Sequence, residues 1–293
     1  MKNTLVLISN ARECALDDKT VQRAAELLWS NGGSVGTTDW LAPGIACELP
    51  FEGKAAALSF PGIDAVVVPT ANRRKRLLVA DMESTVIENE MLDELADFLG
   101  LRDIIAAITA RAMNGELDFA AALAERVGLL RDLPVGKLDE AARRIRYTPG
   151  GATLVATMKK HGAYCALVSG GFTYFTTLVG KALGFDFEAA NVLRHNGKTL
   201  AGAVELPILG KEAKLATLDR LCLERGLPVG EALAVGDGAN DLPMLKAAGL
   251  GVAFHAKPVV AAEVSARIDH GDLTALLYLQ GYRQSDFIER PDP

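Results

Sequence analysis

Two carboxylates follow an apolar run at residues 77–80. Asp81 comes directly after the run, and Glu83 follows two residues later. In open α/β sheets the reactive groups lie just past the carboxyl ends of the strands. Asp81 therefore stands where such a fold would place a nucleophile or a metal ligand. An Asp at this point can also be only a helix cap, and this stretch alone favours neither interpretation.

Two more apolar runs end in polar residues of the same kind. Residues 164–168 are followed by Ser169 and Gly170, and residues 232–235 end near Asp237. A parallel sheet brings the carboxyl ends of its strands to one edge, even when the strands are far apart in sequence. We therefore expect these groups to lie close to Asp81.

The residue types at these three ends suit phosphoryl chemistry. A carboxylate such as Asp81 can attack phosphorus and carry it as an aspartyl-phosphate, and Glu83 could protonate the leaving oxygen. Asp81 and Asp237 offer the hard oxygen ligands that Mg²⁺ takes. Lys214, at the start of a helical pattern, could neutralise phosphoryl oxygens. Each residue alone has an ordinary structural explanation, and only their joint occurrence at strand ends is specific.

Other common chemistries lack their motifs. The first strand is not followed by G-x-G-x-x-G, which argues against a dinucleotide site, and the P-loop sequence G-x-x-x-x-G-K-[ST] is also missing. The nucleophile elbow G-x-S-x-G of serine hydrolases does not occur either.

Length and composition describe an ordinary soluble globular protein. The chain has 293 residues, with 49% hydrophobic and 23% charged residues, so we expect two domains or one domain with an insertion. The formal net charge of -6 argues against nucleic acid as the main partner. The basic run at residues 73–76 could be a nucleic-acid patch, but we interpret it as a solvated linker.

The cysteines indicate a reducing compartment. The four of them are scattered, form no C-x-x-C pair and have no zinc-site spacing. The apolar run at residues 4–8 is too short for a signal peptide or a membrane span. We therefore expect a cytoplasmic protein.

The first part of the chain predicts a small α+β domain. Strand and helix patterns alternate in the order βαββαβ, the ferredoxin-like plan, and we assign residues 1–72 to it. No catalytic cluster occurs here, so its expected role is regulatory, oligomerising or structural. The predicted elements are strands at 3–9, 34–41, 45–50 and 63–68, and helices at 18–31 and 52–58.

Residues 73–293 predict a doubly wound parallel sheet that is interrupted by helices. Apolar residues at helical spacing fill about 89–147, an insert that could cover an active site as a lid or be plain core. Strands and helices alternate after the insert, as in a parallel α/β sheet. The pair Asn196-Gly197 predicts a two-residue hairpin. The other predicted elements are helices at 151–161 and 211–226 and strands near 249–253 and 266–268.

Four segments together resemble the motifs of the haloacid dehalogenase superfamily. The segments are Asp81-Met82-Glu83-Ser84-Thr85, Ser169-Gly170-Gly171, Lys214, and the run Gly236-Asp237-Gly238-Ala239-Asn240-Asp241. Residues 77–283 as a whole resemble its phosphoserine phosphatase family. The resemblance implies a HAD-like, Rossmannoid core with a small helical cap, and an N-terminal ACT-like domain as in the longer bacterial members.

The resemblance also implies roles for individual residues. It makes Asp81 the nucleophile and Glu83 the acid/base, and it implies Mg²⁺ as the cofactor and O-phosphoserine as the small-molecule substrate, in the last step of serine biosynthesis. A homodimer is a further expectation. The implied metal residues are Asp81, Glu83, Asp237 and Asp241; the phosphate binders are Ser169, Gly170 and Lys214; and the residues toward the rest of the substrate are Glu90, Met113, Phe119, Arg126 and Asn240.

One position departs from the family pattern. The second acidic residue of the first motif is usually Asp, whereas this chain has Glu83, whose carboxylate is one methylene farther from the backbone. Because proton transfer depends on hydrogen-bond reach, the change could slow the reaction or be accommodated by the loop. It keeps three alternatives open: a phosphotransferase, a phosphatase for a related compound such as homoserine phosphate, and an amino-acid sensor with weakened catalysis.

Overall fold

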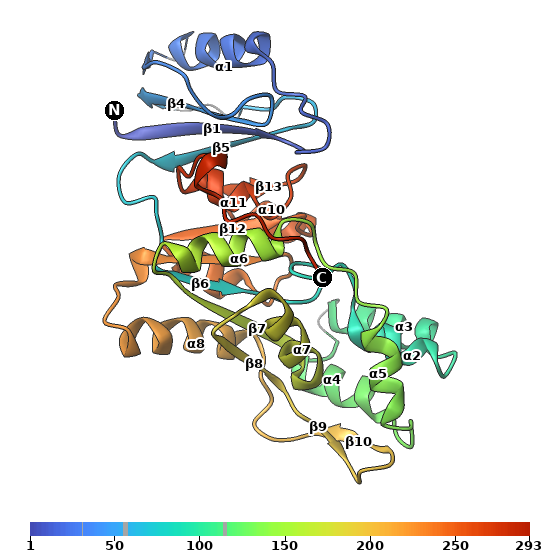
Figure 1. Cartoon of the computed structure of the whole chain (residues 1–293). Helices are drawn as coiled ribbons and strands as arrows, with labels where there is room; N and C mark the ends of the chain where they lie inside the picture. Colours follow the sequence, from blue (N-terminus) through green and yellow to red (C-terminus); the bar gives the residue numbers. More distant parts are fainter. Residues whose placement is uncertain (31, 55–57, 114–115) are drawn as a thin grey trace.

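The computed structural model describes residues 1–30, 32–54, 58–113 and 116–293, with the backbone alone at residues 112 and 113. The chain forms a small antiparallel sheet at one end, a larger parallel sheet in the middle, and a group of short helices beyond the parallel sheet (Figure 1). The predicted combination of a doubly wound α/β core, a helical insertion and an N-terminal α+β unit is confirmed.

The N-terminal unit has the ferredoxin-like strand order. Its strands run β2-β4-β1-β5, all neighbours are antiparallel, and β3 also pairs with β4. Strand β4 thus lies between β1 and β2, which are connected through α1. These elements are β1 (Asn3–Ser9), α1 (Asp18–Ser30), β2 (Ser34–Val35), β3 (Asp39–Ala42), β4 (Ala46–Glu52) and β5 (Ile63–Pro69).

Two predictions for this unit need correction. The expected strand at 34–41 is two short strands, β2 and β3, with Gly36 between them. The expected helix at 52–58 is wrong at its start, because Glu52 pairs with Ser34 as the last residue of β4. Residues 55–57 lie outside the described part of the chain.

The central sheet has six parallel strands in the order β13-β12-β11-β6-β7-β8. Strand β7 is longer than predicted, because it continues through Ser169 to Phe172 after a register shift against β8. The order places β6, β7 and β11 side by side, so their carboxyl ends meet. The strands are β6 (Leu77–Ala80), β7 (Tyr164–Phe172), β8 (Phe187–Asn191), β11 (Ala232–Gly236), β12 (Leu250–Phe254) and β13 (Ala266–Ile268).

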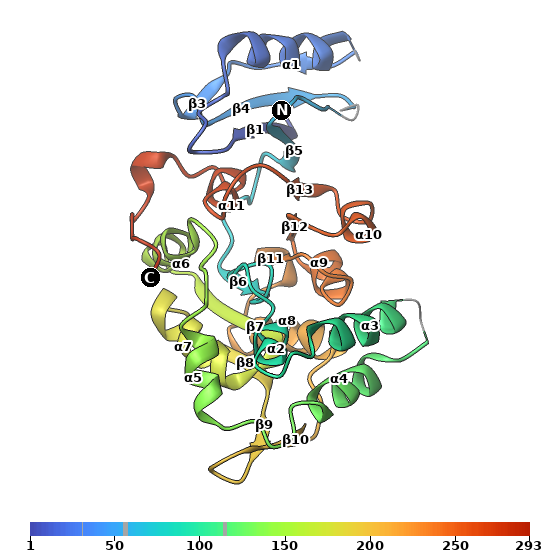
Figure 2. The ribbon, with the colours of Figure 1, turned by 90° about the vertical axis from the view of Figure 1, so that its right-hand side faces the viewer.

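Helices cover both faces of this sheet (Figure 2). Leu77 and Val79 pack with Leu218 on one face, and Leu78 and Ala80 pack with Leu154 on the other, as the two-residue repeat of a strand requires. Burial of both faces explains why the central strands β6, β11 and β12 contain no polar residue. One face holds α8 (Lys211–Glu224), α9 (Leu242–Ala247) and α10 (Pro258–Ala261), and the other holds α6 (Gly151–Lys160), α7 (Thr173–Leu183) and α11 (Ala275–Leu279).

The predicted insert is a helical cap. Two linkers connect it to the sheet and run side by side, with the Glu88 N–H donating to the Arg146 carbonyl over 2.8 Å and the Thr148 N–H to the Val86 carbonyl over 3.0 Å. The cap helices are α2 (Met91–Asp97), α3 (Arg102–Met113), α4 (Phe119–Gly128) and α5 (Gly136–Ala142).

A hairpin from outside the insert completes the cap. Strands β9 (Leu193–His195) and β10 (Leu200–Val204) lie against it, and Leu200 exchanges backbone hydrogen bonds of 3.0 and 2.9 Å with Asp132 and Leu133. The predicted hairpin is confirmed, but its turn is shifted by one residue. The Asn196 N–H donates to the Thr199 carbonyl at 3.1 Å, so Gly197 and Lys198 are the two central residues of the turn. The Asn196 side chain accepts from the N–H groups of Lys198 and Thr199, both at 2.9 Å.

The basic run at residues 73–76 is only partly solvated, because Arg74 and Arg76 are exposed whereas the side chains of Arg73 and Lys75 are largely enclosed. Arg73 pairs with Glu48 at 2.5 Å and donates to the Leu279 carbonyl, and the buried Lys75 ammonium donates to the Asn72 and Gly230 carbonyls. These contacts join the N-terminal sheet, the core and the C-terminal segment. The run is therefore structural.

All four cysteines are free; Cys14 is exposed, and Cys47, Cys165 and Cys222 are buried. Within the described residues, we find no helix with the length and apolar character needed to cross a membrane.

Candidate active site

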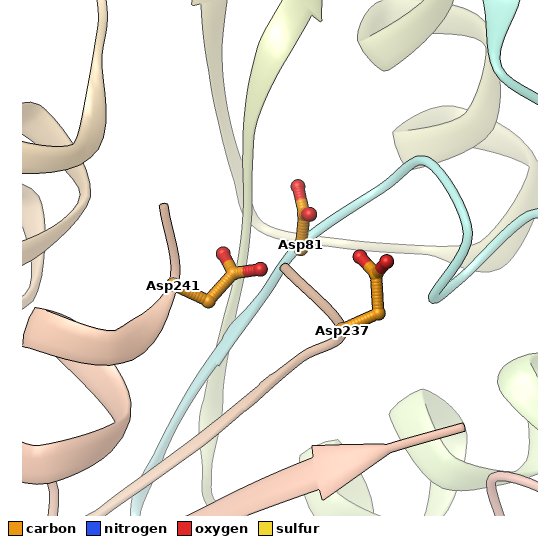
Figure 3. Close-up of side chains that lie close together, drawn as sticks. All are labelled: Asp81, Asp237 and Asp241. Carbon is orange, nitrogen blue, oxygen red and sulfur yellow. The ribbon is translucent and has the colours of Figure 1, made fainter. Parts of the chain in front are cut away.

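Three aspartates meet at the carboxyl edge of the central sheet (Figure 3). Asp81 follows β6, and Asp237 and Asp241 follow the neighbouring strand β11. One carboxylate oxygen of each lies within 4.8 Å of one oxygen of the other two, and all three residues are buried. Their side chains point toward a common space. Residues separated by about 160 positions in sequence are therefore direct neighbours.

Lys214 neutralises part of this negative charge. It lies in the first turns of α8 and is buried, with its Nζ 2.7 Å from an Asp81 oxygen and 2.6 Å from an Asp241 oxygen. Burial disfavours the ammonium, but the two carboxylates outweigh it and raise the pKa of Lys214 above its ordinary value. The lysine therefore stays charged.

Asp81 and Glu83, the two acidic residues of the first motif, both have a pKa above that of an ordinary carboxyl group. Burial, followed by the charge of Asp241, raises the pKa of Asp81 to about 8 against the opposing effect of Lys214. Burial, followed by the charge of Glu90, raises the pKa of Glu83 to about 8 as well. A bound cation would offset this repulsion.

Glu83 connects the sheet edge to the cap. Its Oε1 accepts a 2.8 Å hydrogen bond from the Met91 N–H, at the start of α2. The longer side chain thus reaches the first cap helix. Its carboxylate also lies against β7, where a Cβ added to Gly171 would be 2.6 Å from Glu83 Oε2. Only a glycine leaves room for Glu83 at this point.

Residues 169–171, predicted as a phosphate-binding loop, form the last part of β7, which lies beside β6 and therefore on the side of Asp81. Ser169 is buried, and its Oγ accepts from the Gly171 N–H at 2.9 Å. Asn191, at the end of β8, donates to the Gly170 carbonyl at 2.8 Å and so fixes the loop. The sequence analysis did not identify Asn191.

The segment after β11 is packed equally closely. A Cβ on Gly236 would be 2.4 Å from Asp241 Cγ, so this glycine allows Asp241 to turn back toward the strand. The Gly238 N–H donates to Asp241 Oδ2 at 3.0 Å. Asn240 is half-buried on the same turn, where its Oδ1 lies against Gly238.

The cap-side residues are only partly brought together. Glu90 accepts a 2.8 Å bond from the Ser84 hydroxyl. Arg126 is half-buried and makes no ion pair within 4 Å to any residue of the described segments. Burial lowers its pKa below the ordinary value, and the nearby charges of Glu83, Glu90 and Asp93 offset this only in part. The ring of Phe119 lies against Gly170. The side chain of Met113 lies outside the described part.

Lys257 is a site residue that the sequence analysis missed. It follows β12, its Nζ is 3.2 Å from Asp237 Oδ2, and its N–H donates to the Asp237 carbonyl at 3.1 Å. Its side chain is 46% exposed, so it borders the open side of the site. Its position just beyond another parallel strand was the available signal, since β12 lies beside β11 in the sheet.

The donor set fits a divalent cation. Asp81, Asp237 and Asp241 supply carboxylate oxygens close enough for one ion, and such hard oxygen donors match Mg²⁺. The three aspartates outnumber the two lysines, Lys214 and Lys257, so the cluster has more carboxylates than ammonium groups to neutralise them. The site as a whole can therefore hold a cation and a phosphoryl group together.

Residues 78–246, more than half of the chain, match the family model of the haloacid dehalogenase-like hydrolases. Among curated proteins, the phosphoserine phosphatase of Streptomyces coelicolor is 41% identical over 241 residues, which cover 82% of this chain and 58% of that protein. The phosphoserine phosphatase of Lactococcus lactis is 42% identical, with 69% of this chain and 94% of that protein covered.

A solved structure resembles almost the whole chain. The probable phosphoserine phosphatase from Vibrio cholerae superposes with a TM-score of 0.80 at 28% identity, covering 97% of this chain and 88% of that one. The chain spans less than two thirds of several curated relatives, for example 63% of the phosphoserine phosphatase of Archaeoglobus fulgidus.

Proposed function

This chain belongs to the haloacid dehalogenase-like hydrolase family, and we propose that it hydrolyses O-phospho-L-serine to L-serine and phosphate through an aspartyl-phosphate, as the last step of serine biosynthesis. The observation that carries the proposal is the buried contact of Lys214 with both Asp81 and Asp241 beneath a helical cap. A nucleophile, a fixed cation and further carboxylates meet there in the arrangement that phosphoryl transfer needs.

In the first step, an Asp81 oxygen attacks phosphorus and the ester oxygen of the substrate leaves. The Oδ1 atom of Asp81 is held by Lys214 and by the Met82 N–H at 2.8 Å, which orients the carboxylate. Glu83 gives a proton to the leaving oxygen, so that serine departs as an alcohol. Its burial beside Glu90 supports this role, because a general acid must be protonated before it acts.

In the second step, water attacks the phosphorus of the aspartyl-phosphate. Glu83, now ionised, takes a proton from that water, and the bond between phosphorus and the Asp81 oxygen breaks. Free phosphate and the Asp81 carboxylate result. Lys214, the Ser169 hydroxyl and the Gly170 N–H would contact the phosphoryl oxygens in both steps.

Mg²⁺ would be held by Asp81, Asp237 and Asp241, with the Glu83 backbone carbonyl as a further ligand. It would neutralise the charge that accumulates on the phosphoryl oxygens. On the cap side, Glu90 suits the ammonium group of phosphoserine and Arg126 its carboxylate, while Met113, Phe119 and Asn240 would close around the substrate.

The N-terminal unit, residues 1–72, would be an ACT-like domain, with residues 73–293 as the catalytic unit and the cap at about 89–147. Its strand order supports this proposal, and its lack of a catalytic cluster is consistent with a regulatory, homodimer-forming or structural role.

The proposal is tested by phosphate release with Mg²⁺ and with EDTA. The substrates are L-phosphoserine, phosphothreonine, homoserine phosphate and a sugar phosphate. We expect selective, Mg²⁺-dependent release from L-phosphoserine. Preference for homoserine phosphate, or transfer to an added alcohol in place of water, would contradict it.

The Asp81→Asn variant tests the nucleophile in the same assay. Because the amide cannot form the aspartyl-phosphate, we expect activity to fall by about 10⁴-fold or more, on the order seen when a covalent nucleophile is removed. The melting temperature should not fall, since the substitution removes a buried negative charge from a crowded cluster. Substantial remaining turnover would exclude Asp81 as the nucleophile.

A further inference from the structure

Asn191, the last residue of β8, contacts both chain segments that lead to the proposed phosphate-binding groups. The residue is 2% exposed, and its side-chain amide is held by three hydrogen bonds. One segment is the end of β7, with Ser169 and Gly170, and the other precedes α8, with Lys214. An amide buried in this way does not touch a substrate, so its effect on the reaction must pass through the backbone groups that it holds.

The first segment needs this contact because the strand pairing is interrupted there. The register between β7 and β8 shifts after Val168 and resumes at Phe172, so β7 advances four residues where β8 advances two. Such a bulge disrupts the ladder locally and re-aims the groups it carries. The Nδ2 of Asn191 donates to the Gly170 carbonyl at 2.8 Å and takes the place of a ladder hydrogen bond.

The same peptide unit is fixed on its other side by Ser169. The Gly170 carbonyl and the Gly171 N–H belong to one peptide group, and this N–H donates to Ser169 Oγ at 2.9 Å. Because hydrogen bonds in a chain polarise one another, the bond from Asn191 makes the Gly171 N–H a stronger donor. A hydroxyl oxygen that accepts keeps its own O–H for another partner. The Ser169 hydroxyl is therefore oriented to donate to a phosphoryl oxygen.

The other two hydrogen bonds of Asn191 hold the second segment. Its Oδ1 accepts from the Leu209 N–H at 2.7 Å, and its Nδ2 donates to the Leu209 carbonyl at 3.2 Å. Leu209 precedes Gly210, the N-cap of α8, and Lys214 lies in the first turns of that helix. One amide therefore sets the spacing between the Gly170 backbone and the start of the helix that carries Lys214.

These three contacts require an amide. Two carbonyls need N–H donors and one N–H needs an acceptor, and asparagine provides both kinds of group in one short side chain. An aspartate would turn acceptor oxygens toward the two carbonyls. A leucine of similar size would leave both carbonyls and the N–H without a partner in a buried place.

We propose that Asn191 is a positioning residue for the phosphoryl group. It holds the end of β7 and the start of α8 at a fixed spacing, so that Ser169, Gly170 and Lys214 contact the same phosphate. The effect on turnover rests on the proposed function. The effect on binding of free phosphate does not depend on which phosphate ester is the substrate.

Calorimetric titration of the full-length protein with Mg²⁺ present tests the proposal. Inorganic phosphate is one ligand and reports the phosphate side of the site, and L-serine is the other and reports the cap side. In Asn191→Leu the Kd for phosphate should rise at least about tenfold, because displacements of about 1 Å can cost on the order of 100-fold. The Kd for L-serine should not change. A general loosening of the fold would weaken both.

Asn191→Ala is a second variant, which decides the matter if Asn191→Leu does not fold. It removes the same three hydrogen bonds without adding charge, and it should show the same selective loss of phosphate affinity. The matched control is Thr157→Val, which removes a buried hydroxyl of α6 that accepts from the Ile288 N–H at 2.9 Å. This control should bind both ligands as the unaltered protein does.

Unchanged phosphate affinity in the Asn191 variants, or equal losses of affinity for phosphate and L-serine, would overturn the proposal, as would failure of the unaltered protein to bind phosphate. Binding of phosphate without binding of L-serine would instead contradict the proposed substrate. Phosphate affinity compared between the Asn191 variants and Thr157→Val would then still decide the role of Asn191. With L-phosphoserine as substrate, kcat/KM of Asn191→Leu should fall by about 100-fold.

Discussion

At the scale of single residues, the site depends on close approaches that leave no space for a different side chain. The carboxylate of Glu83 reaches from the edge of the sheet to the first helix of the cap and lies directly against Gly171. A longer acid in the first motif and a glycine on the neighbouring strand therefore form a matched pair. Their fit explains how the unusual Glu83 is accommodated.

Gly171→Ala should lower kcat by about 100-fold, because the new methyl group displaces the Glu83 carboxylate and general acid–base catalysis contributes on the order of 10²–10⁴. In the Glu83→Asp background, Gly171→Ala should lower kcat by less than about tenfold, since the shorter aspartate side chain does not reach Gly171. Steady-state rates of the four proteins measure this coupling.

Gly136→Ala is the control for that comparison, because an added Cβ there meets no atom within 4 Å. It should leave kcat unchanged in both backgrounds. Equal losses from Gly171→Ala in the two backgrounds would show that the alanine acts through the loop and not through Glu83.

Lys257→Met should tighten Mg²⁺ binding by about tenfold, because an ammonium 3.2 Å from Asp237 opposes a second cation on that carboxylate. The same change should raise KM for phosphoserine, since a cation is lost at the mouth of the site. Calorimetric titration with Mg²⁺ and steady-state kinetics test the two effects separately.

Lys246→Met, which removes an exposed lysine paired with Glu263, should change neither quantity. Weaker Mg²⁺ binding in Lys257→Met would mean that Lys257 supports the metal site and does not oppose it.

At the scale of elements, the chain positions its helices with side chains from distant segments. The first turn of α6 begins immediately after the returning cap linker, and its N–H groups are satisfied from the C-terminal tail. Both carboxylate oxygens of Asp292 are used, accepting from the Gly150 and Ala152 N–H groups at 2.8 Å each. The tail therefore acts as an N-cap for a helix 140 residues earlier.

Asp292→Ala should reduce the free energy of unfolding by about 1–2 kcal/mol, the usual cost of losing an N-cap. Chemical denaturation followed by circular dichroism measures this change. Glu289→Ala, on the same tail and exposed, is the control and should change stability by less than about 0.5 kcal/mol. Equal effects of the two variants would argue against capping by Asp292.

At the scale of the whole molecule, the N-terminal unit and the core share one apolar cluster, which includes Val6, Val66 and Leu276. A buried polar contact fixes their orientation. Asp64, on β5 and only 4% exposed, accepts hydrogen bonds from the N–H groups of Asp269, His270 and Gly271, the last at 2.8 Å. We therefore expect the two units to unfold together.

Asp64→Ala should lower the free energy of unfolding by about 3 kcal/mol, because it leaves buried N–H groups without an acceptor. It should also separate the single calorimetric transition into two. Asp39→Ala removes an exposed ion pair between the same two units, with Arg283, and should cost less than about 1 kcal/mol. Scanning calorimetry of the three proteins distinguishes these outcomes, and a single transition in Asp64→Ala would contradict the role given to Asp64.

The sequence by itself determined the central sheet, the helical insert and the three strand ends that carry Asp81, Ser169 and Asp237. These features depend on local patterns, such as apolar runs of strand length and the residues that follow them. The meeting of Asp81 and Asp237 was predictable because parallel strands share an edge. The strand order of the N-terminal unit agreed with expectation, although the helix predicted from Glu52 did not.

Only the tertiary structure decided how distant segments meet. The proximity of Lys257 to Asp237, the contact of Glu83 with Gly171 and the burial of Lys75 all join residues from different parts of the chain. The contact of the β9–β10 hairpin with the cap likewise joins segments that are far apart in the sequence. A lysine or a glycine has the same local pattern whether it is solvated or part of a site, so its role depends on what the fold brings beside it.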